Sequence, residues 1–308
     1  MTTIDGKRYL RNAVLNVWTA QSSFGIDGLR IKFEIEKDIS RYANTAFISV
    51  YNLSQKTRGM ISNEFQRVAL SAGYGDKADK VFDGKITNIF HRREGADFIT
   101  EIYAQDGIDS SSRSVVNIAD SGVRTLTESV RKIAGYFTDA DGLPPTIGEI
   151  SLENGNTMVG GIHYSGYVSD LLDEFAKSYQ FDWFFLDGKF VAVSDGMTLQ
   201  KSTTSILSSE NGLIGVPEVT ELGIKARCLM TPSIYPKSQV RIRSASKTVQ
   251  FGNRFFDNIP ASLGEGTFDV RTITHIGDTR GSDWYSEFEA GRIRGFIPLR
   301  SLDYGATA

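Results

Sequence analysis

Two stretches far apart in the chain share a pattern of apolar and polar positions that predicts a β-hairpin. In the first, which runs from Val81 to Ala104, apolar residues alternate with polar ones over Lys85–His91, Arg92–Gly95 interrupts the alternation, and Asp97–Ala104 resumes it. In the second, Arg271–Ile276 leads through a glycine-containing turn into Asp283–Ala290. A period of two places successive side chains on opposite faces of a sheet, so each stretch predicts strand, turn and strand.

The second hairpin repeats the first at several positions. The residues that align are Gly95, Asp97, Glu101 and Ala104 with Gly281, Asp283, Glu287 and Ala290. Two strand-like segments precede each hairpin, residues 46–53 and 67–72 in the first case and residues 224–230 and 239–244 in the second. Because the order strand, strand, hairpin occurs twice, we interpret the chain as carrying a duplicated β unit.

Further segments complete the first unit. Residues 29–36 alternate apolar and charged side chains, which is typical of a strand with one buried and one wet face. After Ser54, the segment Gln55–Phe65 suits a short helix that would return the chain to the strand at Arg67. The first unit is therefore expected to be mostly sheet.

The middle of the chain has a different pattern. From Asp106 to Gly122 the sequence becomes polar and loses its alternation, which predicts a domain boundary. Thr125 and Glu128 form a capping box for a helix. A second helix, expected to open at Ser165, is indicated by apolar residues at helical spacing.

Asp187-Gly188 lies between two apolar segments, residues 181–186 and 189–193, and is the two-residue turn that favours a tight hairpin. Helices and hairpin together predict a small α/β module inserted between the β units. We expect a β-rich α+β protein with a first β domain at residues 1–115, the module at 116–200, and a second β domain with a tail at 201–308.

Composition narrows the possible functions. The chain has 308 residues, 23% of them charged, and a formal net charge of -3, which argues against a protein that coats phosphate backbones. Its one cysteine, Cys228, excludes an internal disulfide and a four-thiolate zinc site. This cysteine content favours folding in the cytoplasm. The N-terminus lacks a secretory pattern, and no apolar run is long enough to span a bilayer.

Four basic residues stand out on two strands of the last third: Lys225, Arg227, Arg241 and Arg243 lie on the side opposite the apolar residues. If the two strands pair, these residues form a positive stripe. Such a stripe is either a solvated or ion-paired sheet face, or a surface that meets an acidic partner or lines a channel.

Little in the sequence indicates catalysis or a cofactor. No serine or cysteine lies in a nucleophile-elbow motif, and no phosphate-binding glycine motif occurs. The carboxylate pairs Asp106 with Asp109 and Asp278 with Asp283 are the residues that a wall-degrading hydrolase would use. We therefore expect no enzyme and keep that hydrolase as the alternative.

Several weak motifs in a fixed order resemble one family. They include residues 48–54, 68–74, 81–86, 181–194, 208–217, 228–232 and 268–284. The chain resembles the baseplate hub proteins of tailed phages, whose fold is shared by the hub part of type VI secretion spike proteins. The resemblance covers most of the chain, from about Arg30 to Gly291.

The resemblance implies a structural hub. In such a hub, three chains form a homotrimer in which two similar tail-tube-like β-barrels per chain give a pseudo-sixfold ring around a central channel. The ring would connect the hexameric tail tube, or a distal tail ring, to the trimeric spike, with wedge and tape measure proteins as further partners and DNA passing without sequence-specific binding. Its location would be the tail baseplate of the virion, after assembly in the host cytoplasm. A distal tail ring protein is a second alternative within the same fold.

Some relatives carry a lytic or needle domain after the hub. Here the hub is followed by the basic and apolar segment Gly291–Arg300. We expect the spike and any wall enzyme to be separate chains, and the segment to be a docking strand or a loose terminus.

Overall fold

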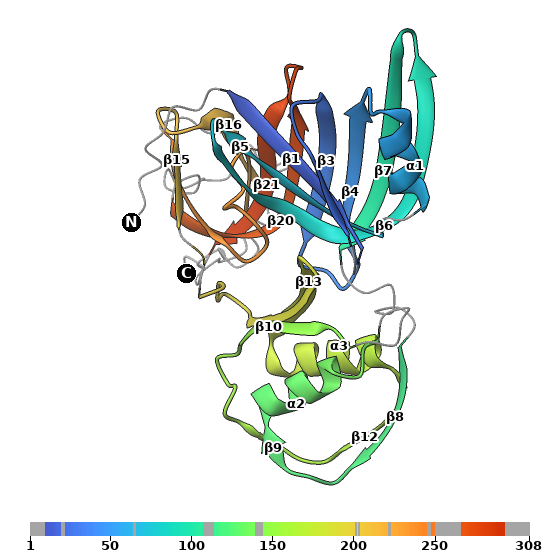
Figure 1. Ribbon diagram of the computed structural model, residues 1–308. Coiled ribbons are helices and arrows are strands. Elements are labelled where there is room, and N and C mark those ends of the chain that lie inside the picture. The colour runs from blue at the N-terminus through green and yellow to red at the C-terminus, as the bar shows by residue number, and fades with distance from the viewer. Residues whose placement is uncertain are drawn as a thin grey trace, which may run out of the picture.

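The computed structural model describes residues 10–19, 22–63, 66–106, 114–138, 144–200, 202, 204–220, 223–244, 248–249 and 266–292, and the account below concerns these residues. The chain is β-rich, and its described residues form 21 strands and three helices. Figure 1 shows a broad array of strands above a smaller module that contains two of the helices. The expected docking segment lies, apart from its first two residues, outside the described residues.

The elements divide into three sets along the sequence. The first set is β1 (Arg11–Trp18), β2 (Ser23–Ile26), β3 (Ile31–Asp38), β4 (Asn44–Tyr51), α1 (Gln55–Asn63), β5 (Arg67–Tyr74), β6 (Lys77–Glu94) and β7 (Asp97–Asp106). The middle set is β8 (Val115–Asp120), β9 (Arg124–Thr125), α2 (Leu126–Ala134), β10 (Thr146–Ser151), β11 (Met158–Val159), β12 (Ile162–Tyr167), α3 (Val168–Tyr179), β13 (Phe181–Leu186) and β14 (Lys189–Ser194). The last set is β15 (Ser205–Ser208), β16 (Leu213–Thr220), β17 (Gly223–Leu229), β18 (Gln239–Arg243), β19 (Thr248–Val249), β20 (Gly266–Asp278) and β21 (Trp284–Arg292).

The first and last sets follow the same strand path. In the first, hydrogen-bonded neighbours run in the order β3, β4, β7, β6, β5, β1; in the last, they run β16, β17, β21, β20, β18, β15. Corresponding strands also occur in the same order along the chain. One pairing differs in direction, because β1 is antiparallel to β5 whereas β15 is parallel to β18. The duplication expected from the hairpins is therefore present in the strand path.

A β-bulge recurs at the same place in both hairpins. The register of β6 against β7 shifts between Ile86 and Asn88, and that of β20 against β21 shifts between Val270 and Thr272. A bulge adds one unpaired residue and bends the strand. Both long hairpins therefore bend at corresponding positions.

Each hairpin also carries a histidine that contacts a hydroxyl group on the facing strand. Nδ1 of His91 lies 3.1 Å from Oγ1 of Thr100, and Nδ1 of His275 lies 2.8 Å from Oγ of Ser286. Both pairs are directly opposite one another in their ladders. The two halves thus share side-chain contacts as well as topology.

The halves are joined edge to edge. Residues Thr272–Asp278 of β20 pair antiparallel with Lys32–Asp38 of β3, which produces one 14-stranded sheet. Two residues of the last set, Met230 and Trp284, pack into the hydrophobic core of the first. The ring of Trp284 meets that of Phe33 edge-on, with 5.6 Å between their centroids. The two halves are therefore one packed body.

The middle set has its own hydrophobic core and confirms two local predictions. Thr125 and Glu128 form the expected capping box at the start of α2. Asp187 and Gly188 both have positive φ, 51° and 75°, as a tight two-residue hairpin turn requires. Among the helices that the structure describes, none combines the length and apolar character of a membrane span.

One expectation for the middle set is wrong, and one strand was not predicted. The stretch after Asp106, where a domain boundary was expected, contains a strand, β8, which pairs along its length with β12. Ser165 lies inside β12 rather than at a helix start, and α3 begins at Val168. Val115, Val116 and Ile118 of β8 are apolar and β-branched, but polar residues precede them and the pairing partner of each strand lies more than 40 residues away.

Candidate functional site

The four basic residues singled out in the sequence do not form one stripe. Lys225 and Arg227 lie on β17, which pairs with β16 and β21, whereas Arg241 and Arg243 lie on β18, which pairs with β15 and β20. Strands β17 and β18 therefore do not pair with each other, as a single stripe would require, because the β20–β21 hairpin lies between them.

Acidic residues of β21 balance the basic residues of β17. Nζ of Lys225 lies 3.5 Å from Glu287 and 3.6 Å from Glu289, and Nη2 of Arg227 lies 3.4 Å from Glu287. The Arg227 guanidinium also lies 4.5 Å from the ring centroid of Tyr285. These contacts form an ion-paired face on the second half. Within the described ranges, Arg241 and Arg243 take part in no such ion pair.

The corresponding face of the first half keeps one ion pair, between Arg92 and Glu101 at 2.6 Å, and adds a cluster of aromatic rings. Ring centroids of Phe47 and Tyr103 lie 4.9 Å apart, and those of Phe90 and Tyr103 lie 5.7 Å apart. A groove of about 450 Å³ over these strands is also lined by Glu34 and Glu36. In the two registers Phe47, Tyr103 and Phe90 correspond to Lys225, Glu289 and Thr274. One backbone path therefore presents two different surfaces.

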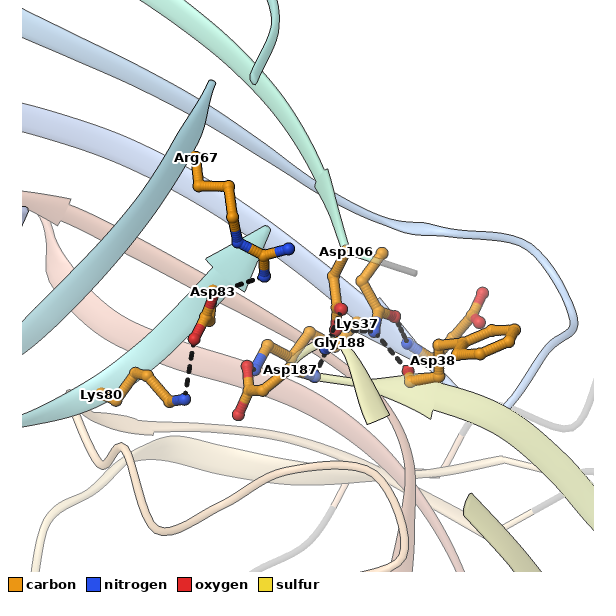
Figure 2. A network of polar contacts seen from close by, with 10 residues as sticks. Lys37, Asp38, Arg67, Lys80, Asp83, Asp106, Asp187 and Gly188 are labelled. Atoms are coloured by element: carbon orange, nitrogen blue, oxygen red, sulfur yellow. Dashed lines mark hydrogen bonds and ion pairs between the residues drawn. The ribbon is translucent and has the colours of Figure 1, made fainter. Parts of the chain in front are cut away.

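A buried polar network joins the middle set to the first half (Figure 2). The carboxylate of Asp106, at the end of β7, accepts hydrogen bonds from the backbone N–H groups of Asp187 and Gly188 and from the side-chain amide of Asn44. Nζ of Lys37, a buried lysine on β3, lies 2.8 Å from the carboxylate of Asp187. The turn of the β13–β14 hairpin is therefore held by both its backbone and its side chain.

Burial changes the protonation of this network. Removal from water raises the pKa of Asp106 to about 6, although the nearby Lys37 ammonium and the hydrogen bonds from Gly188 and Asn44 oppose the shift. Asp106 therefore titrates close to neutral pH, within the contact that fixes the hairpin.

A second buried lysine holds the same hairpin to the other half. Nζ of Lys237, whose side chain is 2% exposed, lies 2.6 Å from Asp182 on β13 and 3.7 Å from Asp269 on β20. Burial raises the pKa of Asp269, against the influence of Lys237 and Arg271. The β13–β14 hairpin thus provides Asp187 as the partner of Lys37 in the first half and Asp182 as the partner of Lys237 in the second half.

A cavity of about 710 Å³ lies where the three sets meet. It is lined by residues of all three, among them Lys37, Ile147, Tyr235 and His275. Burial lowers the pKa of His275 to about 3, so this imidazole is neutral at ordinary pH. Its ring contacts the hydroxyl group of Ser286 on the facing strand, as expected of a buried residue within the hairpin.

The carboxylates considered for hydrolysis have structural contacts. Asp278 is held by Arg30, 2.6 Å away, and by the backbone N–H of Arg280, and these hydrogen bonds outweigh burial and lower its pKa. The backbone N–H of Asp278 bonds to the carbonyl of Asp283, which closes the β20–β21 turn. Asp106 is engaged as above, and Asp109 lies outside the described residues. Over the same ranges, no group of three or more His, Cys, Asp or Glu side chains suits a metal ion.

Similar structures share this fold at low sequence identity. A tail protein from Neisseria meningitidis MC58 has 11% identity and a TM-score of 0.59, over 92% of this chain and 97% of that chain. A 43 kDa tail protein of prophage MuSo2 from Shewanella oneidensis has 8% identity and a TM-score of 0.58, over 91% and 98% of the two chains. The E. coli c3393 protein, a type VI secretion component, has 11% identity and a TM-score of 0.56, over 92% and 80%.

No curated protein sequence matches the chain. The sequence profile of baseplate hub gp41, in contrast, matches residues 13–247, which is most of the chain. The resemblance inferred from the ordered motifs is therefore confirmed: the chain belongs to the baseplate hub gp41 family and is a structural protein of a phage tail baseplate.

Proposed function

We propose that the chain is the structural hub of the baseplate, a homotrimer whose pseudo-sixfold ring connects the hexameric tail tube to the trimeric spike and surrounds the central channel. One observation carries this proposal: two copies of the same six-strand path lie in one chain and are joined edge to edge by β20 and β3. The hub acts by binding over large surfaces and has no catalysis of its own.

Closed rings require the same contact geometry to be repeated around an axis. With two equivalent units per chain, three chains supply six units to a sixfold partner and remain threefold toward a trimeric one. The match between the two strand paths and their bulges supports this reading. A fold with one unit per chain would need six chains for the same ring.

We propose three domains within each chain: residues 1–115 and 201–308 as tube-like β-barrel domains, and 116–200 as the inserted module. Three clusters of buried residues support this division, one centred on each region, with Met230 and Trp284 of the last region joining the first cluster. The module is held to both barrels by the buried contacts of its hairpin, so we expect it to move with them as one rigid part.

The proposed partners are tail tube or distal tail ring proteins on one side and the spike on the other. Wedge and tape measure proteins are further partners at the rim and in the channel, and DNA passes without sequence-specific contacts. Assembly takes place in the host cytoplasm before the hub enters the virion.

Assembly with its neighbours tests this proposal. The purified 34.0 kDa chain, mixed with the tail-tube and spike proteins of the same phage, is expected to form particles containing three copies, with threefold symmetry in class averages. Sixfold averages with six copies would instead identify a distal tail ring protein. A chain that stays monomeric and joins neither protein at high concentration would contradict the proposal.

The basic residues give a second test with a built-in comparison. Arg241→Glu with Arg243→Glu is expected to block assembly while Tm changes little, because these side chains take part in no ion pair among the described residues. Lys225→Glu with Arg227→Glu is expected to lower Tm, because it places new carboxylates beside Glu287 and Glu289. Thermal melts and the same mixing assay measure both. Normal assembly by the Arg241 and Arg243 variant would remove those residues from the partner surface.

A further inference from the structure

The long strand β6 is paired on only one side along its second half. Residues Lys77–Lys85 pair with β5, and Lys85–Glu94 pair with β7. On the β5 side, Thr87–Glu94 meet no other strand in the part of the chain that the structure describes. An open edge of this length leaves backbone N–H and C=O groups available to another strand.

In the second half, the corresponding edge is filled. The equivalent of β6 is β20, and its residues Thr272–Asp278 pair with β3. Through the two hairpin registers, Phe90 and Arg92 correspond to Thr274 and Ile276. The equivalent of β3 is β16, so the strand that would complete β6 by the same geometry is β16 of a second copy.

We infer that the open edge of β6 in one chain pairs antiparallel with β16 of the next chain, and that β19 covers this site on β16 until assembly. The inference rests on the proposed trimer and names its contact. The register follows from the pairing of β20 with β3. It places Phe90 opposite Thr220, His91 opposite Val219 and Arg92 opposite Glu218.

Charge and apolar surface both fit this pairing. Arg92, whose guanidinium already contacts Glu94 and Glu101 in its own chain, would gain Glu218 as a further acidic neighbour, and opposite charges stabilise a directly opposed cross-strand pair. Three apolar side chains at the two edges are exposed in the single chain: Phe90 by 55%, Val216 by 50% and Ile214 by 37%. Pairing of β6 with β16 would remove part of this surface from water.

In the single chain β19 occupies the centre of the predicted site. Its two residues pair in parallel with Glu218 and Val219, the residues that would face Arg92 and His91. A two-residue parallel ladder offers far fewer hydrogen bonds than an antiparallel pairing along β6. The next chain therefore displaces β19 once partners hold the chains together.

A cover of this kind has a physical purpose. The contact joins unlike edges of two copies, and such head-to-tail contacts grow into open filaments unless the ring closes. Covering one of the two edges keeps free chains apart, since both edges must be open for pairing.

Disulfide cross-linking tests the register. Full-length Phe90→Cys and Thr220→Cys chains are mixed in equal amounts, assembled with the tube and spike proteins, and oxidised. Directly opposed residues lie about 5 Å apart, within disulfide reach, so the mixture is expected to give at least tenfold more interchain product than either variant alone. Asn88→Cys in place of Phe90→Cys shifts the register by two residues and is expected to give little product. The native Cys228 is buried in every variant.

The outcomes separate this inference from the hub proposal. Threefold particles without the cross-link would overturn the edge pairing and leave the hub intact, whereas absence of threefold particles would overturn both. Equal product from Asn88→Cys and Phe90→Cys would overturn the register.

The cover is tested by a change that should promote association. Val249→Pro removes a backbone N–H from β19 and is expected to raise the cross-link yield at least threefold before tube and spike proteins are added. Thr248→Val, which suits a strand equally well, is the matched control and should behave as the parent. An unchanged or lower yield for Val249→Pro would show that β19 is not the cover.

Discussion

Lys237→Met is expected to destabilise the chain by about 3 kcal/mol, because it removes one partner of a buried ion pair while the other stays buried. Asp269 would keep a carboxylate that is 5% exposed and has lost the ammonium 3.7 Å away. Since burial already raises the pKa of Asp269, part of the cost is relieved by protonation at low pH, and the loss should grow as the pH rises. Urea unfolding at several pH values measures it.

The matched control is Lys189→Met, which changes an exposed lysine on the hairpin that Lys237 contacts. It should alter the free energy of unfolding by less than about 0.5 kcal/mol. Equal effects of the two substitutions would mean that the Lys237 contact contributes nothing specific. A further variant, Lys237→Met with Asp269→Asn, should recover part of the loss, because it removes the buried unpaired carboxylate and leaves only Asp182, whose side chain is 31% exposed, without its lysine.

Asp106→Asn is expected to change how stability depends on pH. The pKa of Asp106 is raised in the folded state from 3.8 to about 6, so the folded protein binds this proton more tightly than the unfolded chain. The contribution of this carboxyl to stability is therefore fully present below about pH 4 and is lost as the pH rises through 6. At about 1.4 kcal/mol for each pKa unit, the loss amounts to about 3 kcal/mol.

Asparagine has the shape of aspartic acid but no titrating proton. Between pH 3.5 and 6.5 the parent should therefore lose about 3 kcal/mol of unfolding free energy relative to Asp106→Asn. Asp76→Asn, at an exposed turn between β5 and β6, serves as the comparison. A pH-independent difference for Asp106→Asn would contradict the raised pKa and the burial that causes it.

The hairpins were predictable because their information is local. Alternation with a period of two, glycine at the turn and a repeated order of segments identified β6–β7, β20–β21 and the strands before them. The two-residue turn at Asp187 and the capping box at Thr125 were readable for the same reason. Strand β8 was missed although Val115, Val116 and Ile118 favour a strand, because a polar stretch precedes it and its pairing partner β12 is distant in the sequence.

The neighbours of each strand could not be predicted from local pattern. Nothing in the alternation of β17 and β18 shows that a hairpin beginning more than 20 residues further along the chain separates them, so the single stripe expected from the sequence does not form. One missed feature did leave a trace: Lys37 continues the apolar series Phe33 and Ile35 at a spacing of two. A lysine on the buried face of a strand predicts a buried ion pair, although the sequence does not identify Asp187 as its partner.

The difference between the aromatic face of one half and the ion-paired face of the other limits what can bind across both. In the proposed trimer these faces alternate around the axis, so six identical subunits of a neighbour would meet two environments in turn. Such a neighbour would need either tolerant contacts or two conformations of one loop. A partner with three subunits would meet the same kind of face three times. Rotating this partner by 60° about the axis would bring it onto the other kind of face, so it could distinguish these two orientations.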